Sequence, residues 1–439
     1  MLTLLAYLMI ITFMALIMTG RMSALVALIA VPMLFALIGG FGLEIGPMVI
    51  SGLKSISPTG VLLMFAILYF GLMIDVGLFD PLIRFIVKKT KGDPVLVIVG
   101  SAVLAAFVSL DGDGSTTYLL CLTAMLPLHR RFGINPLILP CVTMLSNSIM
   151  NIAPWGGPTG RVMSSLKLDA SQVFLPIIPS MAAATLTTIA IAYFLGVSER
   201  KRLGVIKASS NEFEPSPLGG EIDLDAQGET KPERRPSLMA FNLLLTLVLL
   251  TSLVVGFLPL PVLFMTTFAI AITVNFPRVE DQKKVIATHA PSAVAVVAVI
   301  FAAGVFTGIL NGTKMTEAIA HSVIALIPPE HGNLLPAFTA LISIPMTFFV
   351  SNDAFYFGVV PILAQAAEAY GIAPEIIARA SLIGQPVHQL SPLVAANYVL
   401  MGVAAVEFGA HQRFTFKWAL LLSFIMMIVS GMIDTIPLW

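Results

Sequence analysis

The chain has 439 residues, of which 57% are hydrophobic and only 11% charged, and its mean hydropathy is +0.95. Soluble domains carry about 25% charged residues, so the composition excludes a soluble globular protein and predicts one that crosses a membrane many times. The net charge is zero, which by itself says nothing about a nucleic-acid partner. We expect none. The two cysteines, Cys121 and Cys141, form no metal-ligand pattern and are interpreted as packing thiols.

Apolar runs follow one another from the beginning of the chain. Residues 2–18 continue through Arg21 into a second run, so we interpret them as a membrane span and not as a signal peptide. Roughly 20 residues are needed to cross about 30 Å of hydrocarbon. Runs that approach or reach this length cover residues 22–41, 61–74, 173–195, 238–258 and 420–433.

A polar stretch separates the two apolar halves. Residues 198–236 are rich in charge, proline and glycine, a composition typical of a mobile linker. We therefore predict a first unit over residues 1–197, a cytoplasmic linker over 198–236 and a second unit over 237–439.

The two units resemble each other in sequence. Tyr118 and Tyr356 are 356 − 118 = 238 positions apart. The same offset relates Gly133-Ile134 to Gly371-Ile372, Pro136 to Pro374, and Pro154 to Pro392. A constant offset across several positions indicates an internal duplication.

A short polar tip interrupts the apolar pattern once in each unit. The first tip is "DGDGS" at 111–115, and at the same offset its last three residues, 113–115, fall on "SND" at 351–353. The apolar arms beside each tip average about 15 residues, or about 22 Å of helix, which is short of a full crossing. We therefore predict re-entrant hairpins over about 94–131 and 334–370, with their tips inside the membrane.

Basic residues predict how the units are oriented. Both ends of the first hairpin carry positive charge, at Arg84, Lys88, Lys89, Lys91, Arg130 and Arg131, which places them on the cytoplasmic side. Each unit then has five transmembrane spans and one re-entrant hairpin, and an odd number of crossings inverts the second unit. The predicted fold is an all-α polytopic membrane protein with inverted structural repeats, typical of secondary transporters of the cytoplasmic membrane.

The polar tips are candidate binding residues. Asp111 and Asp113 would cost several kcal/mol in lipid unless they face water, a cation or a proton. Ser115 and Thr116 can cap the second arm or ligate an ion, and Asp353 can do either or carry a proton. Helix capping alone explains Ser115, Thr116 and Asn352 equally well, but a cap needs one acid and not two.

An irregular stretch follows each tip. "LSNSIMNIAPWGGPTGR" (145–161) and "IGQPVHQLSPLVAANY" (383–398) predict broken helices over about 134–160 and 374–398, which at membrane depth line protein or water. Polar side chains there are Asn147, Asn151, Thr159, Gln385, His388, Gln389, Ser391 and Asn397. Amides also join packed spans without any binding role.

Two charged or titratable residues complete the candidate site. His388 titrates near neutral pH and can carry a coupling proton, or act as a structural donor. Arg161, expected at the outer end of the first broken helix, can hold a substrate carboxylate, pair with Asp113 or anchor the interface. The candidate substrate-binding residues are Ser115, Thr116, Asn147, Asn151, Thr159, Arg161, Ser351, Asn352, His388, Ser391 and Asn397, and those for metal or proton coupling are Asp111, Asp113, Asp353 and His388.

These motifs resemble those of a known family. With "SLDGDGSTTYLL", "SNSIMNIAPWGGPTGR", "SNDAFYFGVVPIL" and "HQLSPLVAANY", the chain is similar over essentially its full length to the citrate:metal:proton symporters of the ion transporter superfamily. The resemblance implies uptake of citrate chelated to a co-transported Mg²⁺ or Ca²⁺, inward proton flow, an elevator mechanism and a homodimer.

The tips also depart from those of related carriers. Relatives that import dicarboxylates with sodium carry Ser-Asn-Thr at both tips, whereas this chain has Asp113-Gly114-Ser115 and Ser351-Asn352-Asp353. Extra carboxylates fit a divalent cation or protons.

Other functions remain as alternatives. Within transport they are another carboxylate permease or a cation/proton antiporter of the same superfamily. A membrane aspartyl hydrolase needs acids on two spans, but Asp111 and Asp113 share one turn. Two hairpins argue against a channel, and we expect no enzyme activity.

Overall fold

The computed structural model describes residues 2–89, 93–112, 114–203, 238–255, 258–324, 329–394 and 396–438. Within these ranges the chain is helical and contains no strand. Most of the predicted linker, residues 204–236, lies outside the described residues, as does Asp113. The side chain of Asp111 is also outside the description.

The first unit contains helices of very different lengths. Its helices are α1 (Leu2–Met18), α2 (Ala24–Ile38), α3 (Ile45–Asp75), α4 (Asp80–Lys89), α5 (Pro94–Val108), α6 (Gly114–Arg131), α7 (Ile138–Met150), α8 (Gly157–Leu166), α9 (Ala170–Val173) and α10 (Ile178–Leu203). A short 3₁₀ turn, Ser109–Asp111, follows α5.

The second unit repeats this order. Its helices are α11 (Met239–Val255), α12 (Leu260–Asn275), α13 (Val279–Gly312), α14 (Met315–Ile324), α15 (Leu335–Phe349), α16 (Asn352–Ala354), α17 (Val360–Glu368), α18 (Pro374–Ser381), α19 (Gln385–His388), α20 (Ala396–Ala404) and α21 (Phe408–Met432). At the offset that relates Tyr118 to Tyr356, α1 falls on α11, α3 on α13, α6 on α16 and α17, and α8 on α20.

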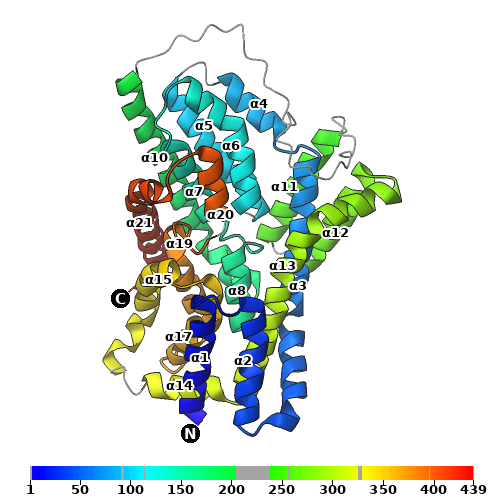
Figure 1. Ribbon diagram of the computed structural model, residues 1–439, viewed down its shortest axis with the longest axis vertical. Coiled ribbons are helices and arrows are strands. Elements are labelled where there is room, and N and C mark those ends of the chain that lie inside the picture. The colour runs from blue at the N-terminus through cyan, green and yellow to red at the C-terminus, as the bar shows by residue number, and fades with distance from the viewer. Residues whose placement is uncertain are drawn as a thin grey trace.

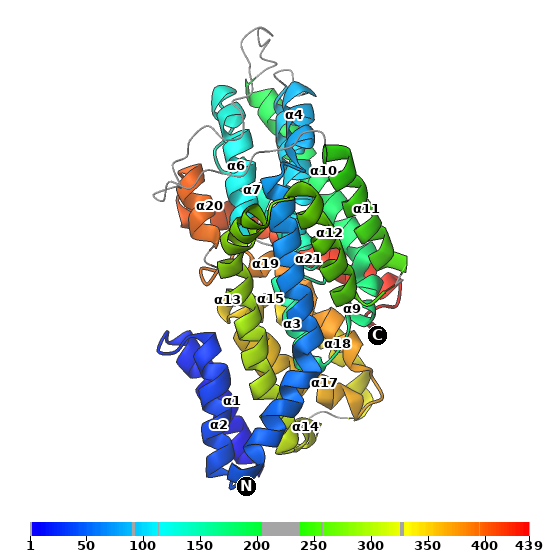
Figure 2. The same ribbon diagram turned by 90° about the vertical axis from the view of Figure 1, so that its right-hand side faces the viewer.

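The two longest helices, α3 and α13, pack against each other and form the spine of the molecule. In both ribbon views α3 runs from α2 toward α4 and α13 runs from α12 toward α14, so the pair is antiparallel (Figure 1, Figure 2). A Cβ atom on Gly52 would lie 2.0 Å from the carbonyl oxygen of Gly304 and 2.8 Å from the Cα of Gly308. Small residues thus allow the backbones to meet, as membrane helices commonly require.

The helices predicted to form the arms of the two hairpins lie toward opposite ends of the spine. Helices α5 and α6 lie at the end that holds α4, whereas α15 and α17 lie toward the end that holds α14 (Figure 1, Figure 2). The units also interlock, because α20 packs against α6, and α8 packs against α17 and the π-helical turn Phe355–Val359. The first break lies between α7 and α8, and the second between α19 and α20. The helix that follows each break, α8 or α20, therefore contacts the predicted hairpin of the other unit.

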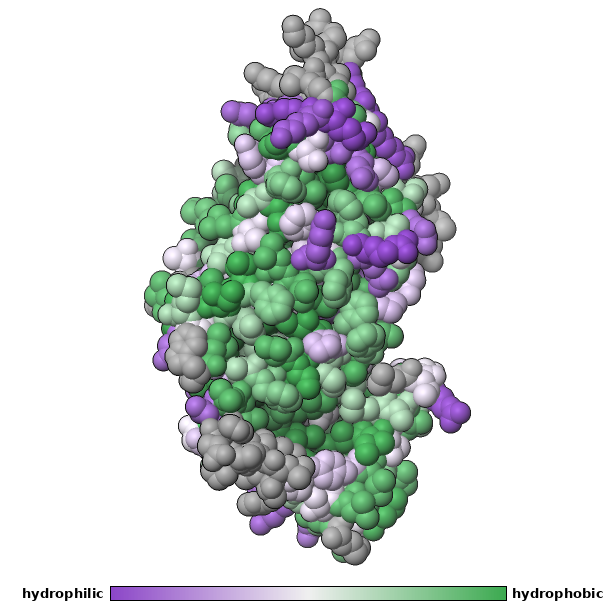
Figure 3. All heavy atoms as spheres, turned by 90° about the vertical axis from the view of Figure 1, so that its left-hand side faces the viewer, coloured by the Kyte–Doolittle hydropathy of each residue, from purple (hydrophilic) through white to green (hydrophobic). Residues whose placement is uncertain are grey.

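The helices carry the apolar surface of a membrane protein. Five described segments are long and apolar enough to cross a bilayer: Gly42–Asp75, Ala170–Leu203, Val279–Gly312, Gly332–Phe349 and Phe408–Met432. One of them contains α15, so this hairpin arm reaches spanning length together with the turn before it. In Figure 3, hydrophobic residues cover most of the visible face and hydrophilic ones gather near one end.

An ionic cluster joins the start of α5, the connection between α6 and α7, and the end of α10 near that hydrophilic end. Asp93 caps α5 by accepting a 3.0 Å hydrogen bond from the backbone N–H of Val95, and it also pairs with Arg200. Glu199 accepts a 3.0 Å hydrogen bond from the backbone N–H of Asn135. These contacts tie the base of the first hairpin to the last helix of its unit.

Candidate functional site

A cavity of about 330 Å³ lies where the two polar tips and the two broken helices meet. Small-molecule sites commonly measure roughly 300–1,000 Å³. Its walls are the first tip (Gly112, Gly114), the first break with α8 (Asn151, Gly157, Pro158, Arg161), the second tip (Ser351, Asn352, Asp353) and the second break with α20 (His388, Gln389, Leu393, Val394, Ala396). Both units therefore contribute to one site.

The first break is built by glycine and by side chains that replace helix hydrogen bonds. A Cβ atom on Gly156 would lie 1.8 Å from the carbonyl oxygen of Asn151, so only glycine fits this turn. The Oδ1 of Asn151 accepts a 3.3 Å hydrogen bond from the N–H of Gly157, and the Oγ1 of Thr159 donates a 2.6 Å bond to the carbonyl of Ile152. These bonds satisfy backbone groups that the interruption leaves free.

The second break is closed in a similar way. The Nδ2 of Asn397 donates hydrogen bonds of 2.6 Å to the carbonyl of Gln389 and 3.1 Å to that of Ser391. Ser391 is buried, and its hydroxyl accepts a 3.2 Å bond from the N–H of Leu393. Thr159, Ser391 and Asn397 thus contact the backbone of the breaks and do not line the cavity.

The first tip is held against the first break by Trp155. Gly112 has a φ of +77°, a conformation that glycine adopts without strain, and a Cβ there would lie 3.1 Å from the indole ring. The indole N–H donates a 2.7 Å hydrogen bond to the carbonyl of Leu110. Ser115 and Thr116 lie in the first turn of α6, directly after Gly114 at the cavity wall.

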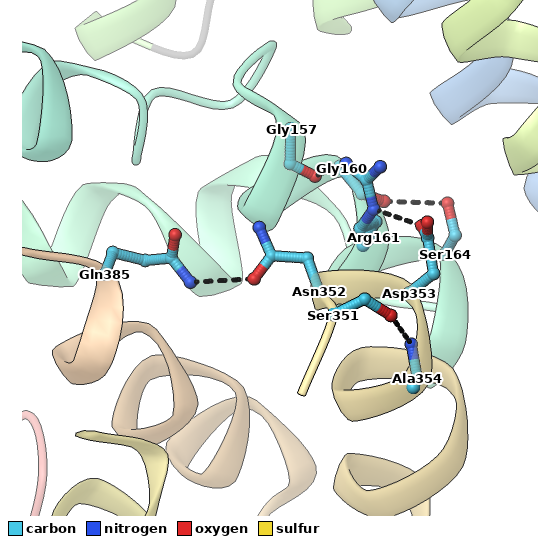
Figure 4. A network of polar contacts seen from close by, with 9 residues as sticks. All are labelled: Gly157, Gly160, Arg161, Ser164, Ser351, Asn352, Asp353, Ala354 and Gln385. Atoms are coloured by element: carbon cyan, nitrogen blue, oxygen red, sulfur yellow. Dashed lines mark hydrogen bonds and ion pairs between the residues drawn. The ribbon is translucent and has the colours of Figure 1, made fainter. Parts of the chain in front are cut away.

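The second tip places three successive polar residues at the cavity. The Oγ of Ser351 accepts a 3.2 Å hydrogen bond from the N–H of Ala354 and so caps α16. The Oδ1 of Asn352 accepts a 3.3 Å bond from the Nε2 of Gln385. Figure 4 shows how these residues face α8 and the second break.

Buried tyrosines connect the breaks to the hairpins. The Nδ2 of Asn147 donates a 3.3 Å hydrogen bond to the hydroxyl of Tyr118, and the Nε2 of Gln385 donates a 2.8 Å bond to that of Tyr356. Both pairs occupy positions related by the same offset, since Asn147 and Gln385 are also 385 − 147 = 238 positions apart. The hydroxyl of Tyr118 also donates to the Oε1 of Gln389, at 3.4 Å, in the other unit. Neither tyrosine was predicted as a site residue, although the two define the offset.

His388 presents one ring nitrogen as an acceptor. Its Nδ1 lies 2.6 Å from the carbonyl oxygen of Thr347. Because a carbonyl only accepts, Nδ1 carries the hydrogen, and the Nε2 of the neutral ring is left with a lone pair. His388 lines the cavity, where this lone pair suits a proton or a donor.

Arg161 and Asp353 form an ion pair between the two units. The Nε of Arg161 donates to the Oδ1 of Asp353 at 2.6 Å, and its Nη1 donates to the carbonyl of Gly157 at 2.9 Å (Figure 4). The side chains are 21% and 17% exposed. The expectation that Arg161 lies at the outer end of the broken helix was wrong, because α8 begins at Gly157 and carries Arg161 to the cavity wall.

The fold and this site define a membrane transport protein: a helical membrane protein with a polar cavity enclosed by two interrupted helices. A family model described as "Citrate transporter" matches residues 13–384. The chain is 56% identical over 436 residues to "Citrate transporter" of Bacillus subtilis (strain 168), covering 99% of this chain and 100% of that protein. The chain belongs to the citrate transporter family, which confirms the resemblance.

A second relative carries a more specific name. The "Mg(2+)/citrate complex secondary transporter" of Bacillus subtilis (strain 168) is 48% identical over 441 residues, covering 100% of both chains. The protein is thus a multi-pass transporter of the cytoplasmic membrane and not an enzyme, so the hydrolase alternative is excluded.

A solved structure has a similar fold. The YdaH transporter of Alcanivorax borkumensis aligns with a TM-score of 0.58 and 15% identity, over 89% of this chain and 88% of that one. At this identity the likeness concerns the fold alone.

Proposed function

We propose that this protein takes up citrate as a complex with a divalent cation, driven by inward proton flow. The observation that carries the proposal is the cavity in which a guanidinium and a carboxylate lie side by side, at Arg161 and Asp353. In a metal–citrate complex, a citrate carboxylate can bind the guanidinium of Arg161 and the cation can bind the carboxylate of Asp353. Membership of the citrate transporter family and likeness to a Mg(2+)/citrate transporter support this reading.

The metal is cargo in this proposal. Among the described side chains, no three His, Cys, Asp or Glu form a group that could hold a metal ion. Mg²⁺ and Ca²⁺ prefer oxygen ligands, and citrate supplies several. Asp353, with Asp111 and Asp113 of the first tip, is proposed to add protein carboxylates for the cation or for protons, and His388 to accept a proton.

The remaining candidates are proposed to act in two groups. Asn151, Arg161, Ser351, Asn352 and His388 line the cavity and are proposed to contact the citrate oxygens. The others are proposed to hold the tips and breaks in place: Ser115, Thr116, Asn147, Thr159, Ser391 and Asn397.

The proposed topology is a pair of inverted repeats, residues 1–197 and 237–439, joined by a cytoplasmic linker over 198–236. Hairpins over about 94–131 and 334–370 enter from opposite faces, and broken helices over about 134–160 and 374–398 follow them. The recurring helix order, the antiparallel α3 and α13, and the hairpin arms at opposite ends support this arrangement.

The proposed mechanism is of the elevator kind. The hairpins and broken helices would carry the cargo past a scaffold that contains α3, α12 and α13. Trp155 of the first break contacts Phe70 of α3 and Phe264 of α12, so these rings mark where the two parts would slide. The family resemblance also implies a homodimer joined through the scaffold, which cross-linking in membranes can test.

Uptake of radiolabelled citrate into vesicles tests the function. The purified protein would be reconstituted and given an inward proton gradient, with Mg²⁺, Ca²⁺ or no divalent ion. We expect uptake that requires both the gradient and a divalent cation. Citrate uptake unchanged by metal removal would contradict the metal-complex cargo, and sodium-driven proton movement without any organic acid would favour an antiporter.

A further inference from the structure

We infer that Asp353 is the residue by which the carrier distinguishes metal-loaded from metal-free citrate. The inference rests on the proposed function, since it assumes that citrate enters this cavity. It assigns to one carboxylate two effects: attraction of the cation in the complex, and repulsion of citrate that arrives without one.

The ion pair with Arg161 leaves both partners able to bind something else. Guanidinium has five N–H donors, and two of its nitrogens have described acceptors: Nε donates to Asp353, and Nη1 to the carbonyl of Gly157. The pair uses a single N–H···O contact through Oδ1 and not the stronger two-bond geometry. Within the described part of the chain, the Oδ2 of Asp353 has no hydrogen-bond partner.

Capping does not account for Asp353. The N-cap of α16 is Ser351, whose hydroxyl accepts the N–H of Ala354. Asp353 follows inside the helix, and its side chain reaches across to α8 of the other unit. The carboxylate therefore does not cap its own helix, and it remains partly exposed to the cavity.

Charge decides which form of citrate fits beside this pair. At neutral pH free citrate carries three negative carboxylates, and one that contacts Arg161 must also lie near Asp353. Like charges this close in a partly buried site repel strongly. A divalent cation between the two carboxylates turns the repulsion into attraction, because Mg²⁺ and Ca²⁺ bind carboxylate oxygens. The same site therefore favours the complex and disfavours the bare anion.

The alternative is that the ion pair only holds the two units together. In that case, loss of the carboxylate would weaken binding of both forms of citrate to a similar extent. The ratio between the two affinities separates this structural role from discrimination.

The test measures citrate binding calorimetrically to the full-length protein in lipid nanodiscs, once with excess Mg²⁺ and once in buffer stripped of divalent ions. We expect Asp353→Asn to lower the ratio of the metal-free to the Mg²⁺–citrate dissociation constant by about tenfold or more. Asp353→Glu keeps the charge and should keep the preference. Glu44→Gln removes an exposed carboxylate at the start of α3, away from the cavity, and should leave the ratio unchanged.

The outcomes separate the two proposals. If the unaltered protein binds Mg²⁺–citrate and Asp353→Asn shifts both dissociation constants equally, the inference is overturned while the function stands. If Asp353→Asn does not fold, loss of the preference in a folded Asp353→Glu protein overturns the inference, and its retention supports it. If the unaltered protein neither binds nor transports citrate with any divalent ion, the proposed function itself fails.

Discussion

The indole N–H of Trp155 donates a 2.7 Å hydrogen bond to the carbonyl oxygen of Leu110, which joins the first broken helix to the tip of the first hairpin. The same ring lies 5.3 Å from the ring of Phe70 and 5.0 Å from that of Phe264, centroid to centroid. One side chain thus contacts the first tip on one side and helices α3 and α12 on the other.

Substitution of Trp155 should therefore affect both stability and uptake. Trp155→Phe keeps a ring but leaves the carbonyl of Leu110 without its donor, which should cost about 1 kcal/mol of the free energy of unfolding. Trp155→Ala also removes the aromatic contacts and should cost more, about 3–5 kcal/mol. Thermal unfolding in detergent and initial rates of citrate uptake measure the two effects.

Trp418 provides a matched control. Its indole N–H is buried without a hydrogen-bond partner in the described part of the chain. Trp418→Phe removes a donor that makes no bond, so its effect on stability should be small. Equal losses in the two Trp→Phe variants would show that the bond to Leu110 contributes nothing.

The ion pair gives a second prediction. Arg161→Gln leaves Asp353 partly buried and without its cation, which should cost about 1–2 kcal/mol of stability at this exposure. It also removes the proposed ligand for a citrate carboxylate, so the affinity for Mg²⁺–citrate should fall at least about tenfold. Equilibrium binding measures the loss.

Arg130→Gln controls for the loss of one positive charge. Arg130 is exposed at the end of α6, away from the cavity, and its removal should leave affinity unchanged. An Arg161→Gln protein that binds Mg²⁺–citrate as well as this control does would remove Arg161 from the site.

The first break gives a third prediction, based on Gly156. Any Cβ there meets the carbonyl oxygen of Asn151 at 1.8 Å, so Gly156→Ala must rebuild the turn that positions α8. Small displacements of binding groups can cost about 10²-fold in rate, and we expect uptake to fall by at least about tenfold. In α20, Gly402 has no atom within 4 Å of its Cβ position, and Gly402→Ala should transport normally.

Much of this arrangement was predictable because the chain repeats its pattern. The offset between Tyr118 and Tyr356 places a polar tip and an irregular stretch twice, and the cavity lies between those segments. Local periodicity and Pro or Gly interruptions are properties of neighbouring residues, which a single sequence displays directly.

The partners across the cavity were not predictable in this way. Arg161 and Asp353 are 192 positions apart, and no local pattern links them. The sequence therefore suggested a substrate carboxylate, Asp113 or the membrane interface as partners of the arginine, and not Asp353. Thr159 and Asn397 looked like lining residues because they are polar in apolar stretches. In the structure they instead donate hydrogen bonds to backbone carbonyls that the interruption of the helix leaves without a partner.

The crossing of α3 and α13 gives a fourth prediction, which compares two glycines in contact. A Cβ on Gly52 meets backbone atoms, the oxygen of Gly304 at 2.0 Å and the Cα of Gly308 at 2.8 Å. A Cβ on Gly304 meets the terminal carbon of the Ile56 side chain at 2.5 Å, and a side chain can move aside. Gly52→Ala must therefore separate the two helices, whereas Gly304→Ala need only shift one isoleucine.

We accordingly expect Gly52→Ala to cost about 3 kcal/mol or more, at or above the usual range for overpacking, and Gly304→Ala about 1–2 kcal/mol. Gly46→Ala, on the same helix and with open space at its Cβ position, should be neutral. The midpoint of thermal unfolding in detergent ranks the three variants. If Gly304→Ala proves as damaging as Gly52→Ala, then side-chain packing around Ile56, and not backbone approach, sets the distance between the two helices. If side-chain packing sets the distance, larger residues at Gly52 should be tolerated once Ile56 is replaced by a smaller residue. If backbone approach sets it, they should not be tolerated whatever residue stands at position 56.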